Sequence, residues 1–259
     1  MNRGKIVRTG MHVLTQPVRR TALPVIKGAG RGLRVRFGES TLSRTIRTGE
    51  GAVEDSLLSL LRPGDVVYDI GANIGWYSLL AARTVGPSGT VLAFEPDLAN
   101  ADLVKRNAAS NRFANVTVVP AAVSDQDGWA TFLDKGSLMG RLDKDDDDAQ
   151  AKRRASRDQR VNGSSPVPVI SLDTWIRATG QPAPTMIKVD IEGAEIGALR
   201  GMADTLRTAR PTLIIELHGT RDAVLDLLDS FDYGHEAIDW DGPTREAPWW
   251  VHVLARPTT

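Results

Sequence analysis

Short apolar segments alternate with helical segments along this chain from residue 66 onward. Segments 66–70, 90–95 and 116–119 have the length and apolar content of buried strands, and helical patterns at 74–83 and 98–110 follow the first two. Strands that alternate with helices indicate a parallel sheet, because the crossover between parallel strands requires a connection about as long as a helix. We therefore predict an α/β fold with a doubly wound, mostly parallel sheet and helices on both faces.

The alternation is interrupted once and then resumes. Residues 134–165 carry separate acidic and basic blocks that cannot bury apolar surface, so we predict a mobile charged insertion there. Such an insertion serves as a lid in some domains and as a solvated loop in others. The elements expected beyond it are strands at 167–172, 186–190 and 212–217, helices at 173–178, 194–208 and 221–230, and final strands near 235–239 and 249–255.

The composition is that of an ordinary globular protein. The chain has 259 residues, of which 41% are hydrophobic, and this is enough for one domain with a sizeable core. The absence of cysteine excludes disulfides, thiolate metal sites and a cysteine nucleophile. The apolar runs are shorter than the ~20 residues of a membrane span, so we expect a soluble, cytoplasmic protein.

Charge is distributed unevenly along the chain. The 32 basic and 32 acidic side chains cancel overall, so we expect no nucleic-acid partner. Residues 1–47 nevertheless contain eleven Lys or Arg side chains and one acid, Glu39. We interpret residues 1–47 as a basic N-terminal extension and residues 48–259 as the main domain. The extension is expected to contact a membrane surface, a lipid-linked or phosphorylated substrate or a second copy of the chain, or else to pack on the acidic remainder.

The first predicted strand ends in a glycine-bearing loop at 69–75, with the sequence Asp-Ile-Gly-Ala-Asn-Ile-Gly. In parallel sheets ligands bind beyond the carboxyl ends of the strands, and glycine lets a ligand approach the main chain. The loop differs from the G-x-G-x-x-G fingerprint of dinucleotide sites, because Asn73 and Trp76 occupy two of its three glycine positions. NAD and FAD are therefore disfavoured, and the phosphate-binding Gly-Lys pattern is also missing.

The second predicted strand ends in Glu95, followed by Pro96. A carboxylate there can accept hydrogen bonds from both ribose hydroxyls of an adenosine. An adenosine site without a pyrophosphate loop fits S-adenosylmethionine, whose positive sulfonium is compatible with the Asp69 carboxylate. Either acid alone could instead cap a helix or a turn.

Two later strands are expected to bring polar side chains to the same edge of the sheet. Lys188 and Asp190 share one face of strand 186–190, and Glu216 and His218 share a face after strand 212–217. If these strands are neighbours, Asp190, Glu216 and His218 converge there. His218 is the best suited to accept a proton near neutral pH, although a single histidine is more often structural. The acids could alternatively hold a divalent cation, but they lack the spacing of a calcium loop, and we predict no metal.

Two blocks of this sequence are specific in combination: Asp-Ile-Gly-Ala-Asn-Ile-Gly at 69–75 and Lys-Val-Asp-Ile-Glu-Gly-Ala-Glu at 188–195. Together with Phe-Glu-Pro at 94–96, these blocks resemble the FkbM family of S-adenosylmethionine-dependent methyltransferases, over about residues 48–220. Further matching positions are Ser78, Asn107, Asn111, Ala122 to Asp125, Gly128, Leu172-Asp173, Arg210-Pro211 and Glu216.

The resemblance implies a class I methyltransferase fold, which is a Rossmann-like sheet of seven strands whose last strand inserts antiparallel. It implies S-adenosylmethionine as cofactor and O-methylation, usually in natural-product or glycan biosynthesis. Asp69, Gly71, Asn73 and Gly75 would form the loop at the methionine end of the cofactor, Glu95 would hold the ribose, Ala122 and Asp125 would lie by the adenine, and Asp190 would lie near the sulfonium.

We accordingly predict an enzyme that moves the methyl group of S-adenosylmethionine to a hydroxyl oxygen of a small-molecule or glycan acceptor. In-line displacement with help from a general base is the expected mechanism, and Asp190, Glu216 and His218 are the candidate bases. The alternatives are an N-methyltransferase, a non-catalytic protein that binds the cofactor, and a dinucleotide-dependent oxidoreductase. Trp240, Trp249 and Trp250 are expected in the core.

Overall fold

The computed structural model describes residues 21–36, 51–133, 141–143 and 164–258. Most of the predicted insertion at 134–165 lies outside these ranges, as does much of the predicted extension at 1–47. The boundary between extension and domain and the mobility of the insertion therefore stay predictions.

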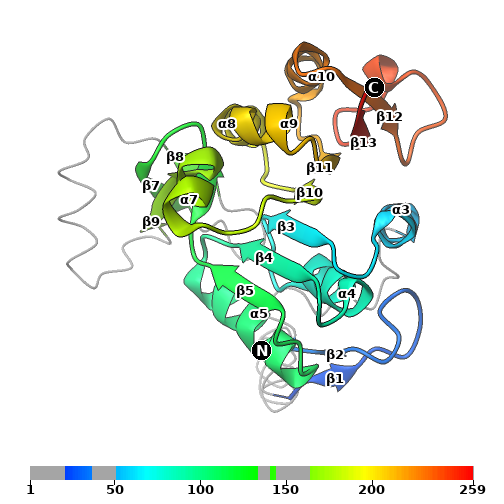
Figure 1. Ribbon diagram of the computed structural model, residues 1–259, viewed down its shortest axis with the longest axis vertical. Helices are drawn as coiled ribbons and strands as arrows, with labels where there is room; N and C mark the ends of the chain where they lie inside the picture. The colour runs from blue at the N-terminus through cyan, green and yellow to red at the C-terminus, as the bar shows by residue number, and fades with distance from the viewer. Residues whose placement is uncertain (1–20, 37–50, 134–140, 144–163, 259) are drawn as a thin grey trace, which may run out of the picture.

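A seven-stranded sheet forms the centre of the fold (Figure 1). Its strand order is β12-β13-β11-β10-β3-β4-β5, and β13 runs antiparallel between β11 and β12 while the pairs from β11 to β5 are parallel. This confirms the doubly wound, mostly parallel sheet and its inserted last strand. The strands are β3 (Val66–Ile70), β4 (Thr90–Phe94), β5 (Val116–Val119), β10 (Met186–Val189), β11 (Thr212–Glu216), β12 (Tyr233–Ala237) and β13 (His252–Pro257).

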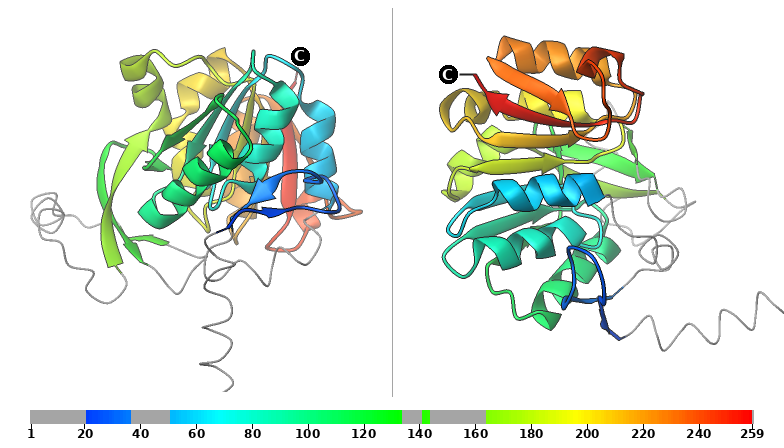
Figure 2. Two further views of the ribbon diagram at one scale, coloured as in Figure 1. Left: turned by 90° about the horizontal axis from the view of Figure 1, so that it is seen from below. Right: turned by 90° about the vertical axis from the view of Figure 1, so that its right-hand side faces the viewer.

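Helices cover both faces of this sheet, as Figure 2 shows from two further directions. Helices α3, α4 and α5 pack on one face, and α8, α9 and α10 pack on the other. None of the helices in the described ranges is long and apolar enough to cross a bilayer. The helices are α3 (Gly51–Leu60), α4 (Trp76–Val85), α5 (Leu98–Ser110), α7 (Leu172–Thr179), α8 (Glu195–Gly201), α9 (Ala203–Thr208), α10 (Arg221–Ser230) and the 3₁₀ turn η1 (Thr244–Glu246).

Alternating side chains of each central strand divide the core between the two faces. Val67 joins the cluster under α3 and α4, whereas its neighbour Tyr68 joins the cluster under α8, α9 and α10. Tyr68 packs against Phe94 with ring centroids 5.5 Å apart, and both side chains are fully buried. Burying one such side chain stabilises the fold by about 1.5–3 kcal/mol, so the central strands are held firmly and position the residues at their ends.

The strand predicted at 167–172 belongs to a second sheet. It is part of β9 (Ser164–Ser171), which pairs in parallel with β6 (Ala122–Ser124) and antiparallel with β7 (Gly128–Leu133). Strand β8 (Arg141–Asp143) completes the order β6-β9-β7-β8. The chain therefore leaves the central sheet after β5 and returns to it only at β10.

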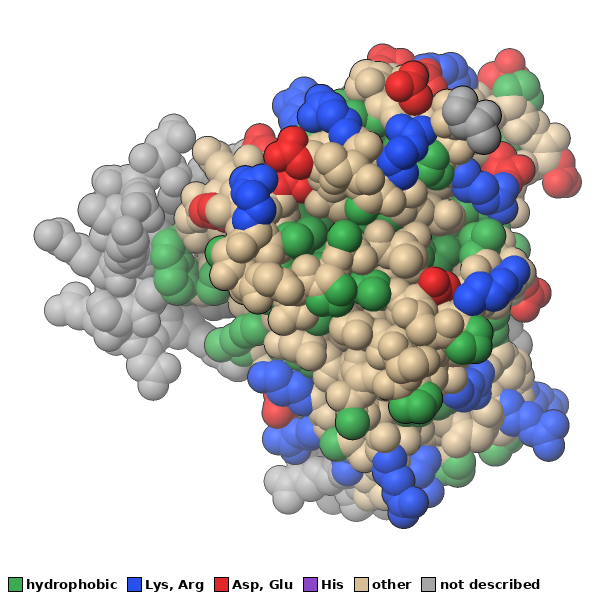
Figure 3. Space-filling model, viewed as in Figure 1, with side chains coloured by type: hydrophobic (Ala, Val, Ile, Leu, Met, Phe, Trp, Pro, Cys, Tyr) green, Lys and Arg blue, Asp and Glu red, His purple; other side chains and the backbone are tan. Residues whose placement is uncertain are grey.

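Part of the basic N-terminal segment is packed on the domain as a hairpin of β1 (Leu23–Pro24) and β2 (Arg34–Val35). The fully buried Asn107 side chain accepts a hydrogen bond from the Arg36 backbone N–H at 2.7 Å and donates to the Ile74 carbonyl at 2.9 Å. Asn111 accepts a hydrogen bond from the Arg34 backbone N–H and donates to the Arg34 carbonyl, and Asn107 likewise donates to the Arg36 carbonyl. In Figure 3, Lys and Arg side chains gather along the lower margin, where this hairpin and α5 lie.

The helix predicted at 194–208 is divided into α8 and α9. Helix α8 ends at Gly201, and the next residue, Met202, has a non-helical φ of −120° and ψ of 23°. Gly201 packs against Ser124, where an added Cβ would lie 1.8 Å from the Ser124 carbonyl oxygen. The carboxylate of Asp173 then accepts hydrogen bonds from the backbone N–H groups of Asp204 and Thr205, at 2.8 and 2.9 Å, and from the Thr205 hydroxyl at 2.6 Å. A new helix begins there because Asp173 satisfies N–H groups that have no partner within α9.

We expect Asp173→Ala to lower the free energy of unfolding by about 2 kcal/mol, because it removes a cap and leaves buried N–H groups without an acceptor. Urea denaturation measures the change. The control is Asp204→Asn, in an exposed ion pair with Arg177, which should change stability by less than ~1 kcal/mol. Equal effects of the two substitutions would contradict the capping role.

The expectation of a core position for three tryptophans is wrong. Trp240, Trp249 and Trp250 are 42%, 65% and 47% exposed. They lie in the connection between β12 and β13, and neither face of the central sheet covers them there.

Candidate active site

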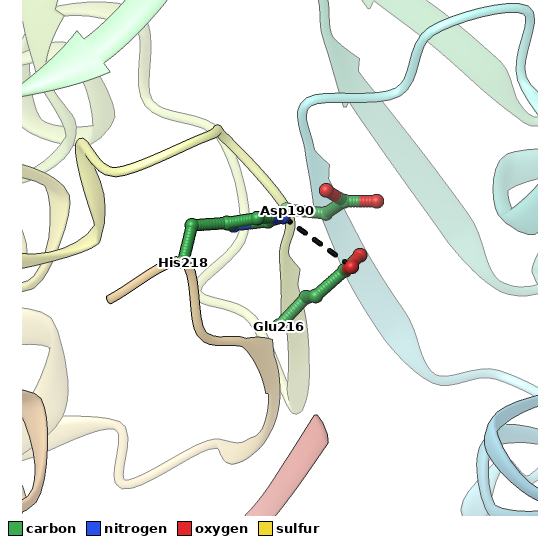
Figure 4. Close-up of side chains that lie close together, drawn as sticks. All are labelled: Asp190, Glu216 and His218. Carbon is green, nitrogen blue, oxygen red and sulfur yellow. Dashed lines mark ion pairs between the residues drawn. The ribbon is translucent and has the colours of Figure 1, made fainter. Parts of the chain in front are cut away.

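The carboxyl ends of β3, β4, β10 and β11 meet at one edge of the central sheet. Lys188 of β10 pairs in register with Asp69 of β3, and Asp190 follows directly after β10. One donor atom each from Asp190, Glu216 and His218 lie within 4.8 Å of one another. Figure 4 shows the three side chains turned toward a common point. The convergence expected from strand alternation is thus confirmed, while the role of each residue stays a prediction.

The glycine-bearing loop at 69–75 is wedged between the ends of β4 and β10. Gly71 has a φ of 86° and donates its N–H to the Phe94 carbonyl at 3.0 Å. A Cβ on Gly71 would lie 1.9 Å from the Asp190 carbonyl oxygen. Asn73 also has a positive φ, of 52°, which asparagine tolerates better than most side chains. The loop is therefore held in one conformation by its neighbours on both sides.

Gly71→Ala should be far more disruptive than a glycine substitution that adds backbone strain alone. We expect it to cost at least about 3 kcal/mol of stability, since the methyl group collides with main chain that cannot move freely. Gly180→Ala is the matched control, because Gly180 also has a positive φ, of 66°, but an added Cβ meets nothing within 4 Å. Its cost should be about 1–2 kcal/mol. Thermal unfolding followed by circular dichroism compares them, and similar melting temperatures would refute the close-packing argument.

Glu95 lies directly after β4 with 5% of its surface exposed. One carboxylate oxygen accepts the Asn73 N–H at 2.7 Å, and the other accepts the Asp97 N–H at 2.8 Å. Burial raises the pKa of Glu95, and these two donors oppose that rise. Glu95 thus ties the glycine-bearing loop to the start of α5 and retains acceptor capacity on both oxygens.

A buried lysine pairs with one carboxylate of the site and acts through its charge on a second. Lys188 Nζ lies 3.0 Å from Asp190 Oδ2 and 4.3 Å from the ring centre of Tyr77. Asp69 Oδ2 accepts a hydrogen bond from the Ser78 hydroxyl at 2.5 Å. Burial raises the pKa of Asp69, and the charge of Lys188 opposes the rise. Strand alternation placed Lys188 on this face, but the sequence did not show it as the partner of Asp190.

Carboxylates surround His218. Its Nδ1 lies 2.9 Å from Glu195 Oε1, and its Nε2 lies 3.3 Å from Glu216 Oε1 and 3.7 Å from Glu192 Oε2. Burial disfavours the charged ring, but Glu195, Glu216 and Glu192 outweigh burial and raise the pKa of His218 to about 10. The block at 188–195 contains Glu192 and Glu195, yet only the tertiary contacts show that both face the histidine.

The residues of the loop and of Glu95 fit S-adenosylmethionine. Within the described part of the chain, the buried atoms Asp69 Oδ1 and Asn73 Oδ1 have no hydrogen-bond partner. Buried acceptors of this kind normally have a partner, so a ligand with donor groups suits them. Ala122 lies in β6, and the exposed Asp125 follows it with its backbone against α8 near Gly201. The assignment of Ala122 and Asp125 to the adenine stays a prediction.

A seven-stranded sheet with an inserted antiparallel last strand, a glycine-bearing loop after its first parallel strand and an acid after the second define a class I methyltransferase fold. Residues 69–237 match the family described as the methyltransferase FkbM domain. The chain belongs to this family of methyltransferases.

Two relatives are similar in sequence, and one solved structure is similar in fold. The 31-O-demethyl-FK506 methyltransferase FkbM of Streptomyces tacrolimicus is 31% identical over 185 residues, which cover 63% of this chain and 69% of that protein. The hexuronic acid methyltransferase AglP of Haloferax volcanii is 27% identical, over 67% of this chain and 64% of that protein. A crystal structure of methyltransferase FkbM from Methylobacillus flagellatus superposes with a TM-score of 0.50 at 21% identity, over 76% of this chain and 45% of that one.

Proposed function

We propose that this protein transfers a methyl group from S-adenosylmethionine to a hydroxyl oxygen. The proposal rests on the position of Asp190 between the cofactor loop and the polar cluster. The backbone of Asp190 packs against Gly71 of the loop, and its side chain lies close to Glu216 and His218. A single residue therefore joins the place expected for the methyl donor to a cluster of proton acceptors.

The cofactor site consists of the loop at 69–75, Glu95 and the side chain of Asp69. Glu95 accepts hydrogen bonds from the ribose hydroxyls, and the free oxygens of Asp69 and Asn73 accept from the methionine end. When bound, S-adenosylmethionine supplies a methyl group on a positively charged sulfur, and transfer leaves S-adenosylhomocysteine and a methyl ether. Asp69 and Asp190 place negative charge beside the loop, which favours a cationic ligand.

Asp190 is the base that the geometry favours. During transfer the acceptor O–H bond breaks as the new O–C bond forms, and the proton passes to a carboxylate. Lys188 engages Oδ2 of Asp190, and the side chain is 30% exposed, so an acceptor can reach it. His218 is less suited, because Glu195 engages Nδ1 and the carboxylates around Nε2 favour a positive species there.

The acceptor enters beside α10. A hollow of about 410 Å³ lies at the N-terminal end of α10, lined by Gly219, Thr220, Arg221 and the exposed indole of Trp249 among others. An exposed indole can pack against the apolar face of a sugar or macrocycle. The two relatives are named for methylation of FK506 at a 31-O position and of a hexuronic acid, and we propose a hydroxylated natural product or glycan for this chain as well. Lys27 and Arg31 of the hairpin are exposed at the opposite end of the sheet from α10, where they suit contact with an anionic membrane surface.

Isothermal titration calorimetry with S-adenosylhomocysteine and NAD tests the proposal on the full chain. We expect the former to bind and NAD not to bind. Failure of S-adenosylhomocysteine to bind would refute the cofactor assignment, and binding of NAD instead would favour an oxidoreductase. Incubation with a labelled methyl donor and a panel of hydroxylated and amine acceptors, read by mass spectrometry, then separates O-methylation from N-methylation and from binding without turnover.

A further inference from the structure

We infer that Asp190, Glu216 and His218 form a site for a divalent cation. The three side chains come from two neighbouring strand ends and turn toward one point (Figure 4). Nε2 of His218 lies 3.3 Å from Oε1 of Glu216, and the three donor atoms lie within 4.8 Å of one another. Ligand bonds of 2.0–2.2 Å at right angles place neighbouring donors about 3 Å apart, so small side-chain movements suffice to close them around an ion.

A buried carboxylate fixes the orientation of the histidine. Glu195 is fully buried and accepts hydrogen bonds from the Gly193 N–H and the Thr220 hydroxyl at 2.8 and 2.9 Å. Its Oε1 also lies 2.9 Å from Nδ1 of His218, so that Nε2 points toward Glu216. A histidine that binds a metal almost always donates its other ring N–H to such a partner. Glu195 lies outside the three-residue cluster and provides this partner.

The charges around the cluster favour a cation. Asp190, Glu192 and Glu216 bring three carboxylates to Nε2 of His218. Two buried side chains adjoin the cluster: Lys188 Nζ lies 3.0 Å from Oδ2 of Asp190, and Nε2 of His252 lies 3.4 Å from Oε2 of Glu216. Each of these contacts uses one carboxylate oxygen, and Oε1 of Glu216 remains beside Nε2 of His218.

The donor set indicates the kind of ion. Two carboxylates and one imidazole suit Mn²⁺ or Mg²⁺, and the lack of cysteine removes the soft ligands that favour Cu⁺. Three protein ligands leave positions for water or an acceptor hydroxyl. The catalytic consequence of this site rests on the proposed function. An acceptor oxygen bound to the cation would lose its proton more readily, so a weaker base than Asp190 alone would suffice. The sequence analysis predicted no metal, because the acids lack the spacing of a calcium loop, and a divalent cation was only its alternative.

Calorimetric titration of the EDTA-treated full chain with MnCl₂ tests the site, and electron paramagnetic resonance of Mn²⁺ counts the bound ions. We expect one saturable site per chain. Glu216→Gln should weaken Mn²⁺ binding at least tenfold, and Glu195→Gln should weaken it by about 10–100-fold without touching the ion. The matched control is His235→Gln, which alters a histidine that lies 3.3 Å from Asp229 away from the cluster and should leave Mn²⁺ affinity unchanged.

Absence of saturable Mn²⁺ binding to the unmodified chain would overturn the inference, and so would affinities that neither Glu216→Gln nor Glu195→Gln changes. Calorimetry and electron paramagnetic resonance on the unmodified chain test Mn²⁺ binding without any substitution. The result therefore stands even if a variant fails to fold. S-adenosylhomocysteine binding is measured on the same metal-free protein. Binding of S-adenosylhomocysteine without Mn²⁺ binding overturns the cation site alone, whereas loss of S-adenosylhomocysteine binding overturns the proposed function.

Discussion

Replacing Asp190 with asparagine is expected to lower kcat by about 10²–10⁴-fold, while S-adenosylhomocysteine binding stays within about tenfold of the original. The amide cannot accept the acceptor's proton, but the Asp190 backbone, which packs against Gly71, is unchanged. Lys188 loses one partner and keeps Asp69 and the ring of Tyr77 nearby. Single-turnover rates with saturating cofactor measure the effect, and thermal unfolding confirms that the variant is folded.

Asp226→Asn makes the same chemical change at an exposed position of α10 and should leave the rate unchanged. A full rate for Asp190→Asn would remove Asp190 from the mechanism. Raising the Mn²⁺ concentration separates a role of Asp190 as base from a role as cation ligand. If Asp190→Asn recovers part of its rate, the carboxylate also binds the cation. If it recovers none, the carboxylate acts as a base alone.

Glu95→Gln is expected to weaken S-adenosylhomocysteine binding by about 100-fold or more. The carboxylate accepts two backbone N–H groups, and the amide can accept only one of them while its NH₂ group faces the other donor. Hydrogen bonds to a charged group contribute about 1.5–3 kcal/mol each, so losing one within the site and one to the ribose explains a change of this size. Calorimetry measures the affinity.

The pH dependence of binding provides a second measurement on Glu95. Burial raises the pKa of this carboxyl, and binding needs the ionised form, so affinity should decrease as the pH falls through that raised pKa. Glu95→Gln should lack this decrease because it cannot ionise. The control is Glu236→Gln, in an exposed ion pair with Arg256, which should retain both affinity and pH dependence. Unaltered binding by Glu95→Gln would exclude the ribose role.

Much of the fold follows from local patterns. The period of two within strands and the helical patterns between them predict the order of elements, and the ends of α5 and α10 agree with the sequence boundaries. The second sheet was not expected, because a strand such as β9 looks the same in sequence whichever sheet it joins. The division between α8 and α9 was also missed, because it involves the tertiary hydrogen bonds from Asp204 and Thr205 to Asp173.

By itself the sequence determined that Asp69, Glu95, Asp190, Glu216 and His218 lie at or near the carboxyl ends of predicted strands. Whether these ends meet depends on which strands are neighbours, and the strand order of the fold decided that. Only the tertiary structure decided what each side chain experiences there. Glu195 and Glu192 surround His218, and Lys188 lies between two acids, through contacts that chain order does not specify. Charge interactions and desolvation depend on distance through space, so the chemistry of these groups is set by neighbours that the fold supplies.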